Sequence, residues 1–554
     1  MSQSALSPSA DNKKWWRGCV LYQIYPRSYQ DTNGDGVGDL KGITQRLEHV
    51  ASLGVDGIWI SPFFRSPMKD FGYDVSDYCD VDPLFGTLDD FKQLIEKAHA
   101  LKLKVMLDHV WSHTSDQHEW FKESRSSRDN AKHDYYVWAD PKPDGTAPNN
   151  WLSYFGGQAW TFDATRQQYY MHHFLSSQPS LNLWNPRVRQ EIKDAAAFWL
   201  NLGVDGFRLD VCNTYLYDQQ LRDNPVRPAG MPKPSDMPPS NPMSWQIRKY
   251  QFSLPENIEI IEELAEFVSQ WPDRCLMGEI GGEDSEKVAA AYTQTGKRLN
   301  LAYSFGLLGS DLSRVAVREI VDTVENDLND GWVSWACNNH DIPRVVSRLP
   351  GSQFDKTADK ARMAMALGLS LRGSYVMYQG EELGLTQADL ALPDLRDPYD
   401  ISLYPFHHGR DGTRTPMPWT PNEPYGDFTN GSERPWLPMP EEHRQRAVST
   451  QENVPDSILA YTRKLLQIRK NAAALSYGDF SWADMIEAPL VAYFRETESE
   501  KYLCVFNPTD ADVNVACPDF ITDASLQASP LSQYIKINGD KLQLQPFGFA
   551  YIKL

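Results

Sequence analysis

The stretch GFRLDV, residues 206 to 211, is typical of a buried β-strand that ends in a charged pair. Side chains two positions apart on a strand point the same way, so Arg208 and Asp210 project together while Leu209 faces the helices. In a barrel of parallel strands, the carboxyl ends of the strands form the site. The stretch therefore predicts a barrel strand that presents an arginine and an aspartate at its carboxyl end.

Seven further runs of this kind lie between about residues 19 and 470, with amphipathic helical stretches between them. This alternation predicts a parallel sheet with crossover helices. Eight strands close a (β/α)8 TIM barrel, and we predict an α/β fold of that type. The other runs are VLYQIYP from Val20, GIWIS from Gly57, KVMLD from Lys104, LMGE from Leu276, LAYSF from Leu301, VSWACNNHD from Val333 and SYVMYQG from Ser374.

Two long stretches interrupt the alternation, and a third segment follows it. Residues 114–178 are rich in Trp, Tyr, Asp and Gly without helical periodicity, and residues 386–450 are dense in Pro, Asp and Arg. Loops of this length are usually functional or form small subdomains. We predict a catalytic barrel in two parts, 15–113 and 179–472, an inserted subdomain over 114–178 after strand 3, an excursion over 386–450 after strand 8, and a C-terminal antiparallel β-sandwich over 473–554.

The composition, 41% hydrophobic and 23% charged residues, is that of a soluble globular protein. The polar amino terminus predicts no secretory signal, and no apolar run is long enough to span a membrane. A net charge of −20 repels nucleic acid and anionic lipid, so a neutral small molecule is the expected partner. Seven scattered cysteines without a CxxC pair indicate reduced thiols, and we expect a cytoplasmic protein.

Acids and histidines recur at the carboxyl ends of four of the predicted strands. Asp108 closes KVMLD with His113 five residues later, Glu279 closes LMGE, and His340 and Asp341 follow the seventh strand. A structural ion pair is the alternative for Arg208 and Asp210 taken alone. Four acids that converge on one end of a barrel instead indicate an active site.

Two carboxyl groups that flank a glycosidic bond suffice to hydrolyse it, one ionised and one protonated near neutral pH. Arg208 beside Asp210 should lower the pKa of that carboxyl and keep it ionised, as a nucleophile requires. Glu279 has no basic neighbour in the sequence, so we expect its pKa to be raised. These environments assign Asp210 as nucleophile and Glu279 as acid/base.

Ordered motifs now make the chain recognisable: WWRGCVLYQIYPRSYQDTNGDGVGDLKGI, GYDVSDY, DHVWSH, QPSLN, GFRLDV, NNHD, GEELG and GRDGTRTPMPW. The chain resembles glycoside hydrolase family 13, the α-amylase superfamily, and within it the α-glucosidase and oligo-1,6-glucosidase group. The resemblance implies that Asp341 is the third catalytic acid. It also implies substrate contacts from His113 and His340, orientation of the nucleophile by Arg208, and a supporting role for Asp108 in the floor of the site.

The same resemblance implies how the non-reducing end of the sugar is held. Within GYDVSDY, Tyr73 is a substrate-binding residue and Asp74 pairs with an arginine of GRDGTR. Arg410 is preferred over Arg414 for that arginine. A blocked non-reducing end makes such an enzyme exo-acting.

The stretch DTNGDGVGD, residues 31 to 39, places oxygen donors at loop positions 1, 3, 5 and 9, with glycine at the sixth. This is the first part of an EF-hand calcium loop, without its terminal Glu. A metal-free, Asx-rich turn is the alternative. The resembling family carries a structural Ca²⁺ or Mg²⁺ here, which implies the ligands Asp31, Asn33, Asp35, the Val37 carbonyl and Asp39. No organic cofactor is expected.

The expected enzyme is a retaining α-glucosidase that acts on short sugars as a monomer or homodimer, and glucosyl transfer is an expected side activity beside hydrolysis. Oligo-1,6-glucosidase and an isomerase of sucrose are the alternatives within the family, and a non-catalytic sugar-binding relative is the alternative outside enzymes. In the resembling group, Val at the position of Val211 tends to accompany α-1,6 activity, so we expect this chain to accept α-1,6 as well as α-1,4 bonds.

Overall fold

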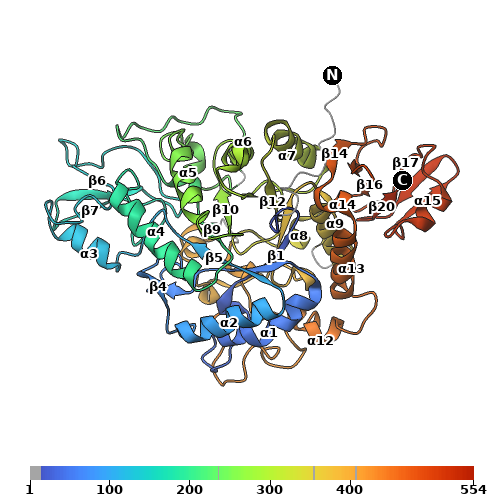
Figure 1. Cartoon of the computed structure of the whole chain (residues 1–554), viewed down its shortest axis with the longest axis horizontal. Helices are drawn as coiled ribbons and strands as arrows, with labels where there is room; N and C mark the ends of the chain where they lie inside the picture. Colours follow the sequence, from blue (N-terminus) through green and yellow to red (C-terminus); the bar gives the residue numbers. More distant parts are fainter. Residues whose placement is uncertain (1–13, 235, 353–355, 406–408) are drawn as a thin grey trace.

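The computed structural model describes residues 14–234, 236–352, 356–405 and 409–554 (Figure 1). Most of the polar amino terminus, on which the expectation of no secretory signal depends, lies outside the described residues. Among the described helices none is long and apolar enough to cross a membrane. All seven cysteines lie in the described part of the chain, and all are free thiols.

The eight predicted strands form one closed parallel barrel, which confirms the fold class. Each strand pairs with the next in the chain, and β13 pairs with β1 to close the ring. The strands are β1 (Val20–Ile24), β2 (Gly57–Ile60), β5 (Lys104–His109), β9 (Gly206–Leu209), β10 (Cys275–Ile280), β11 (Leu301–Ser304), β12 (Val333–Trp335) and β13 (Ser374–Tyr378).

Alternation along the strands separates two apolar layers. Met277 of β10 lies in the cluster that fills the barrel, together with side chains such as Trp59 and Tyr303. Its neighbour Leu276 belongs to the larger cluster between strands and helices, as does Leu209 of β9. Arg208 therefore points inward and Leu209 outward, as the period of two requires.

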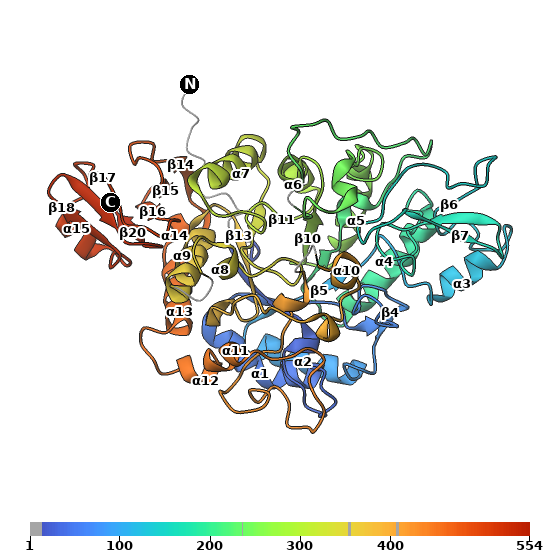
Figure 2. The ribbon, with the colours of Figure 1, turned by 180° about the vertical axis from the view of Figure 1, so that it is seen from behind.

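Amphipathic helices surround the barrel (Figures 1 and 2). Their starts carry the polar caps that satisfy free backbone N–H groups: Asp39 accepts from Gly42 N at the start of α1, and Thr87 and Asp90 form a capping box on α2. The main helices of this layer are α1 (Leu40–Leu53), α2 (Leu88–Ala100), α4 (Pro186–Asn201), α5 (Asn257–Val268), α6 (Ser285–Thr293), α7 (Arg314–Asp327), α8 (Val345–Arg348), α9 (Thr357–Ser370) and α13 (Ile458–Asn471).

Three excursions leave the carboxyl ends of the strands. The first follows β5 and holds a sheet in the order β6 (Trp138–Ala139), β8 (Gln168–Met171), β7 (Trp160–Asp163). It also holds helix α3 (Glu119–Ser126), which the sequence did not predict; its Phe121 ring stacks on Trp138 at 5.7 Å between centroids. The excursion after β13 contains α10 (Pro398–Leu403), α11 (Glu441–Gln445) and α12 (Val448–Gln451).

A long connection between β9 and α5 is the third excursion, and the sequence analysis did not predict it. Only two 3-10 turns interrupt its described residues, Cys212–Thr214 and Pro242–Trp245. The prolines in DNPVRPAGMPKP and PPSNP remove backbone donors and restrict φ, so this segment cannot continue a helix or strand. It later contributes residues to the pocket.

The chain ends in two antiparallel sheets, which lie at the opposite end of the molecule from β6 and β7 in both views (Figures 1 and 2). Apolar side chains from both sheets, among them Val505 and Leu544, form a core between them, as a β-sandwich requires. One sheet has the order β14 (Asp479–Trp482), β15 (Val491–Glu496), β16 (Lys501–Phe506), β20 (Phe549–Lys553), and the other β17 (Val513–Ala516), β19 (Lys541–Leu544), β18 (Ile535–Asn538).

Candidate active site

Arg208 holds three carboxylates from three adjacent strands. Its Nη1 lies 2.8 Å from Asp108 Oδ1 and 2.7 Å from Asp210 Oδ1, and its Nη2 lies 2.5 Å from Glu279 Oε2. The parallel register brings these groups together, because Asp108 of β5 lies opposite Arg208 of β9. Asp210 and Glu279 are therefore held on two nitrogens of one buried guanidinium.

Burial governs the protonation of these acids. It raises the pKa of Asp210 to about 7, and Asp108 adds to the rise while Arg208 opposes it. Burial and the charge of Asp210 likewise raise the pKa of Glu279 to about 8, again against Arg208. Arg208 does lower the Asp210 pKa, as expected, but desolvation outweighs it, so the expectation that the net pKa is depressed is wrong. Glu279, which has no basic neighbour in the sequence, has Arg208 beside it in space. Glu279 still holds its proton to the higher pH.

Asp341 lies on the loop after β12 and is ionised. Burial alone would raise its pKa, but His340, Arg410 and Arg414 outweigh burial and hold that pKa below its usual range. Arg414 Nη2 lies 2.7 Å from Asp341 Oδ1 and Arg410 Nη1 lies 3.2 Å from the same oxygen. Asn339 shapes the loop, since its Oδ1 accepts the N–H groups of Asp341 and Ile342 at 2.9 Å each.

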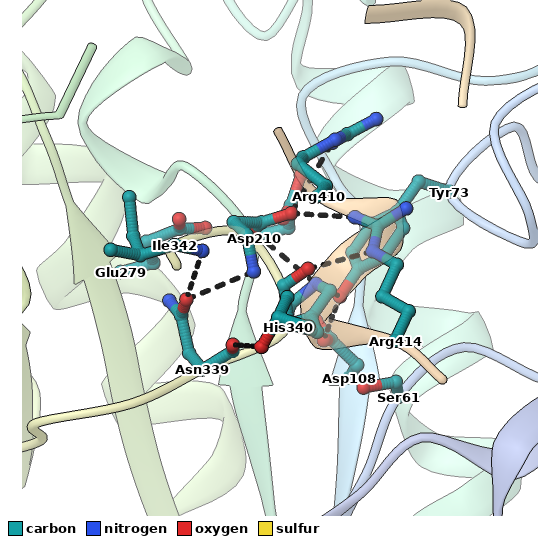
Figure 3. Close-up of polar contacts among 12 residues, drawn as sticks. Ser61, Tyr73, Asp108, Asp210, Glu279, Asn339, His340, Ile342, Arg410 and Arg414 are labelled. Atoms are coloured by element: carbon teal, nitrogen blue, oxygen red, sulfur yellow. Dashed lines mark hydrogen bonds and ion pairs between the residues drawn. The ribbon is translucent and has the colours of Figure 1, made fainter. Parts of the chain in front are cut away.

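A hydrogen-bond chain runs beneath the pocket and sets one histidine tautomer. Gln23 Nε2 donates to His340 Nδ1 at 2.8 Å, which leaves the proton of His340 on Nε2, 2.7 Å from the Tyr73 hydroxyl. Tyr73 then donates to Asp108 Oδ2 at 3.0 Å. Burial lowers the pKa of His340 to about 3, so the ring is neutral. Figure 3 shows His340, Tyr73 and Asp108 together.

His113 lies on the other side of the pocket. Ser112 Oγ is 2.8 Å from its Nδ1, and Gln178 Nε2 and the Tyr73 carbonyl lie 3.2 Å and 3.0 Å from its Nε2. Burial lowers the pKa of His113 to about 4. Ser112 thus supports the ring, and Gln178 brings the QPSLN motif into the site.

A pocket whose empty space, including the part open to solvent, is about 780 Å³ lies above these groups. Six of the predicted site residues line the pocket: Asp210, Glu279, Asp341, Tyr73, His113 and Arg410. Three others lie beneath it and do not line it: Arg208, Asp108 and His340. Aromatic side chains form much of the wall and offer flat faces for stacking, namely Tyr154, Phe155, Phe174, Phe252, Phe305 and Tyr399.

The predicted pairing of Asp74 with an arginine is wrong. Asp74 is fully buried, and its carboxylate accepts hydrogen bonds from Ser66 Oγ, Lys69 N and Asp70 N at 2.9, 2.9 and 3.0 Å. Those bonds fasten the turn and leave the carboxylate outside the pocket. Asp70 takes the expected place: its Oδ1 lies 3.1 Å from Arg410 Nη2, and its Oδ2 accepts from Gln178 at 2.9 Å.

Val211 has an unusual backbone conformation beside the nucleophile. Its φ of 36° and ψ of 47° lie in the left-handed region, which is strained for a β-branched residue. In this conformation its N–H donates to Glu279 Oε2 at 3.0 Å, and the residue lines the pocket. The strained residue that follows Asp210 therefore donates a backbone hydrogen bond to the other central carboxyl group, Glu279.

Sequence reasoning missed several pocket residues. Asp70 stands three positions before Tyr73 in KDFGYD, so the same short stretch contains both the predicted partner of the arginine, Asp74, and the actual one. Asp236 and Phe252 come from the long connection after β9, for which the run of prolines was the available signal. Arg248 pairs with both Asp236 oxygens at 2.9 and 3.0 Å, and no sequence pattern indicated that pair.

The loop of residues 31–39 turns its carboxylates toward its own backbone. Asp31 accepts from the N–H groups of Asn33, Gly34 and Gly36, and Asp35 from Val37 N and Asn33 Nδ2. Asp39 caps α1 and binds Thr32. These hard oxygens suit Ca²⁺ or Mg²⁺, and each carboxylate has about four acceptor positions, so some remain open. Across the described residues, no three acidic, His or Cys side chains converge as a metal site.

Comparison with known proteins places this site in a family. The model of the α-amylase catalytic domain matches residues 23–478. The chain belongs to the α-amylase family. A probable α-glucosidase of Rhizobium meliloti is 49% identical over 513 residues, covering 92% of this chain and 91% of that protein. An oligo-1,6-glucosidase of Heyndrickxia coagulans is 37% identical, covering 91% and 94%. The crystal structure of an α-glucosyl transfer enzyme superposes on this α-amylase-family chain with a TM-score of 0.92 at 46% identity, covering 98% and 99%.

Proposed function

We propose that this protein is an exo-acting, retaining α-glucosidase that cleaves glucose from the non-reducing end of disaccharides and short oligosaccharides. One observation carries the proposal: Asp210 and Glu279 share the Arg208 guanidinium at the base of a pocket bounded by the Asp70–Arg410 ion pair. In retaining enzymes the two carboxyl groups lie about 5 Å apart, whereas inverting enzymes space them more widely to leave room for a water. Two carboxyl groups that share one guanidinium favour the shorter distance.

In this mechanism Asp210, once ionised, attacks the anomeric carbon while protonated Glu279 gives its proton to the leaving oxygen. A covalent glucosyl ester forms on Asp210. Glu279, now a base, takes a proton from water, which attacks the ester and releases glucose with its original configuration. Asp341, ionised between two arginines, is placed to hold sugar hydroxyls, and neutral His113 lies on the pocket wall beside the sugar. Neutral His340 supports the floor from beneath through the Tyr73 hydroxyl.

The anomer of the first product tests this proposal. Two inversions restore the starting configuration, so NMR during hydrolysis of 4-nitrophenyl α-glucoside should detect α-glucose before mutarotation. First appearance of β-glucose would contradict a retaining mechanism. No release of nitrophenol would leave a non-catalytic sugar-binding protein as the alternative.

Glucosyl transfer is a second activity that one observation favours: the α-glucosyl transfer enzyme is 46% identical along nearly the whole chain. A retaining mechanism permits it, because an acceptor hydroxyl can replace water at the Asp210 ester. We propose that transfer products accumulate at high maltose concentration. Chromatography of such a reaction would detect trisaccharide before glucose dominates, and its absence would restrict the enzyme to hydrolysis.

For linkage, we propose that Val211 permits α-1,6 as well as α-1,4 cleavage. Val211→Thr tests this, because Thr is also β-branched and keeps the backbone strain while exchanging a methyl for a hydroxyl. The variant should favour maltose over isomaltose by about tenfold relative to the parent protein. An unchanged ratio of kcat/KM values would remove Val211 from the account of linkage.

Two further features remain proposals. The loop of Asp31, Asn33, Asp35, Val37 and Asp39 is proposed to bind a structural Ca²⁺ or Mg²⁺, supported by its hard oxygen donors. A cytoplasmic location is proposed from seven free thiols, five of them buried, which suit a reducing compartment. Calorimetric titration of the apoprotein with Ca²⁺ tests the first proposal, and cell fractionation tests the second.

A further inference from the structure

The wall that closes the pocket contains a carboxylate with no role assigned so far. Arg410 contacts Asp70 at 3.1 Å and Asp341 at 3.2 Å, both of which line the pocket. Its shortest contacts are to Asp397, whose Oδ2 accepts from Nε and whose Oδ1 accepts from Nη2, each at 2.6 Å. Asp397 is fully buried and does not line the pocket.

This two-pronged contact determines where the guanidinium points. A carboxylate that binds Nε and one Nη fixes the plane of an arginine side chain. With that edge held by Asp397, Nη1 faces Asp341, and Nη2 also reaches Asp70. Without Asp397, the charged partners left to orient the Arg410 guanidinium would be Asp70 and Asp341, each through a single contact.

Asp397 also fixes a second wall residue. Its Oδ1 accepts from Tyr399 N at 3.2 Å, which caps the start of α10, and the Tyr399 ring lines the pocket with its centroid 5.7 Å from the Arg410 guanidinium carbon. One carboxylate thus sets both an arginine and an aromatic ring on the same wall.

Asp397 is held in turn by a set of backbone contacts between its own segment and the segment of Arg410. Asp411 Oδ2 accepts from Arg396 N at 2.6 Å and from Asp397 N at 2.8 Å. Asp400 accepts in return from Arg410 N at 2.9 Å and Asp411 N at 3.0 Å. Asp411 therefore fastens the same two segments through backbone N–H groups, whereas Asp397 binds the Arg410 side chain itself.

We propose that Asp397 is a positioning residue for recognition of the non-reducing glucose unit, acting through Arg410 and Tyr399. The inference rests on the proposed exo-acting function and extends it to a residue outside the pocket. Its ligand class is a neutral sugar with free hydroxyls at the closed end, which Arg410 and Asp70 can receive as donor and acceptor.

Calorimetric binding of glucose and of 4-deoxyglucose, which lacks the hydroxyl at the closed end, tests the proposal. Asp397→Asn keeps the shape and a capping oxygen but turns an amide toward Arg410. We expect it to weaken glucose binding about tenfold or more and to change 4-deoxyglucose binding little, since loss of a charged hydrogen-bonding partner has an effect of this size. In hydrolysis of 4-nitrophenyl α-glucoside, the same variant should raise KM more than it lowers kcat.

Asp411→Asn is the matched control, because it weakens the backbone hydrogen bonds that join the same two segments. It should lower the melting temperature, while the ratio of the dissociation constants for glucose and 4-deoxyglucose stays that of the parent protein. Equal losses in both variants, or equal losses on both sugars, would overturn the proposal and make Asp397 purely structural. If Asp397→Asn does not fold, Asp397→Ser keeps a cap for Tyr399 N and releases Arg410, and the same outcomes decide.

Failure of the proposed function is distinguishable from failure of this inference. If the parent protein binds glucose in preference to 4-deoxyglucose and Asp397→Asn loses that preference, but no nitrophenol is released, the function is wrong and the positioning role stands. If it hydrolyses the glucoside and Asp397→Asn leaves both sugars unaffected, the function stands and the positioning role is wrong.

Discussion

At the scale of single residues, Arg208 is the group on which the chemistry converges. It is fully buried and touches Asp108, Asp210 and Glu279. One positive charge cannot neutralise three buried carboxylates, so one or more of them must carry a proton near neutral pH. Because acids outnumber bases in this site, a protonated carboxyl group is available to protonate the leaving group.

Asp210→Asn and Glu279→Gln should each lower kcat/KM by roughly 100-fold to 10,000-fold or more while the protein stays folded, because each keeps shape and removes one chemical role. Kinetics on 4-nitrophenyl α-glucoside measure the loss, and circular dichroism checks the fold. Asp74→Asn is the control: its carboxylate lies outside the pocket, so it should affect the melting temperature rather than kcat. Near-parental turnover in either catalytic variant would refute the assignment.

The dependence of kcat/KM on pH should be a narrow bell with its maximum between about pH 7 and 8. The reaction needs Asp210 ionised and Glu279 protonated, the Asp210 pKa is raised to about 7, and the Glu279 pKa to about 8. Activity falls below this window as Asp210 gains a proton and above it as Glu279 loses one. Rate measurements from pH 5 to pH 9 check this, and a flat profile would contradict it.

The same shifts predict a slope in stability. Both folded-state pKa values lie above the ordinary 3.8 and 4.5, so the stability these groups contribute is present below about pH 4 and lost as pH rises to about 8. Relative to Asp210→Asn, which has one fewer titrating acid, the parent melting temperature should fall across that window.

At the scale of elements, prediction from sequence succeeded where the chain alternates regularly and failed in the irregular connections. Eight apolar runs, four of which lead into acids, were enough to predict the barrel and the place of Asp210, Glu279 and Asp341, because parallel strands bring their carboxyl ends together. Asp70, Asp236 and α10 could not be placed in the same way. Their positions depend on turns and on contacts between segments far apart in sequence, and the periodicity of the sequence does not predict such contacts.

The loop of residues 31–39 is the element for which removal of metal gives the clearest test. It braces the excursion after β13, since Asp31 N donates to the Phe428 carbonyl and Trp436 N to the Gly36 carbonyl, both at 2.9 Å. If Ca²⁺ binds there, chelation should lower the melting temperature more than the activity measured at low temperature. Asp35→Ala, an exposed position, should melt at the same temperature with and without chelator. An unchanged parental melting temperature would exclude a stabilising metal.

At the scale of the whole molecule, the three excursions and the barrel together make a pocket rather than an open groove. Asp70, from the connection after β2, meets Arg410, from the excursion after β13, across one side of the pocket. Tyr154 and Phe252 come from the excursions after β5 and β9. We therefore expect this pocket to receive the free end of a linear chain rather than the middle of one.

Maltotriose should therefore yield glucose and maltose as first products, and a cyclodextrin, which has no free end, should be hydrolysed at least about a hundredfold more slowly. Chromatography of the early products measures both. An endo-acting α-amylase on the same substrates is the control for assay sensitivity. Ring opening at a rate comparable to maltose would contradict the closed wall.

The pairing of β1 with β13 also has a consequence for synthesis on the ribosome. At about 5 to 20 residues per second, Ser374 is added roughly 20 to 70 s after Ile24. Throughout that interval the first strand has an unpaired edge, which invites association with other nascent chains. Production yield of this protein should consequently depend on holding the emerging chain apart from its neighbours, and a truncation ending before β13 should aggregate rather than form a smaller enzyme.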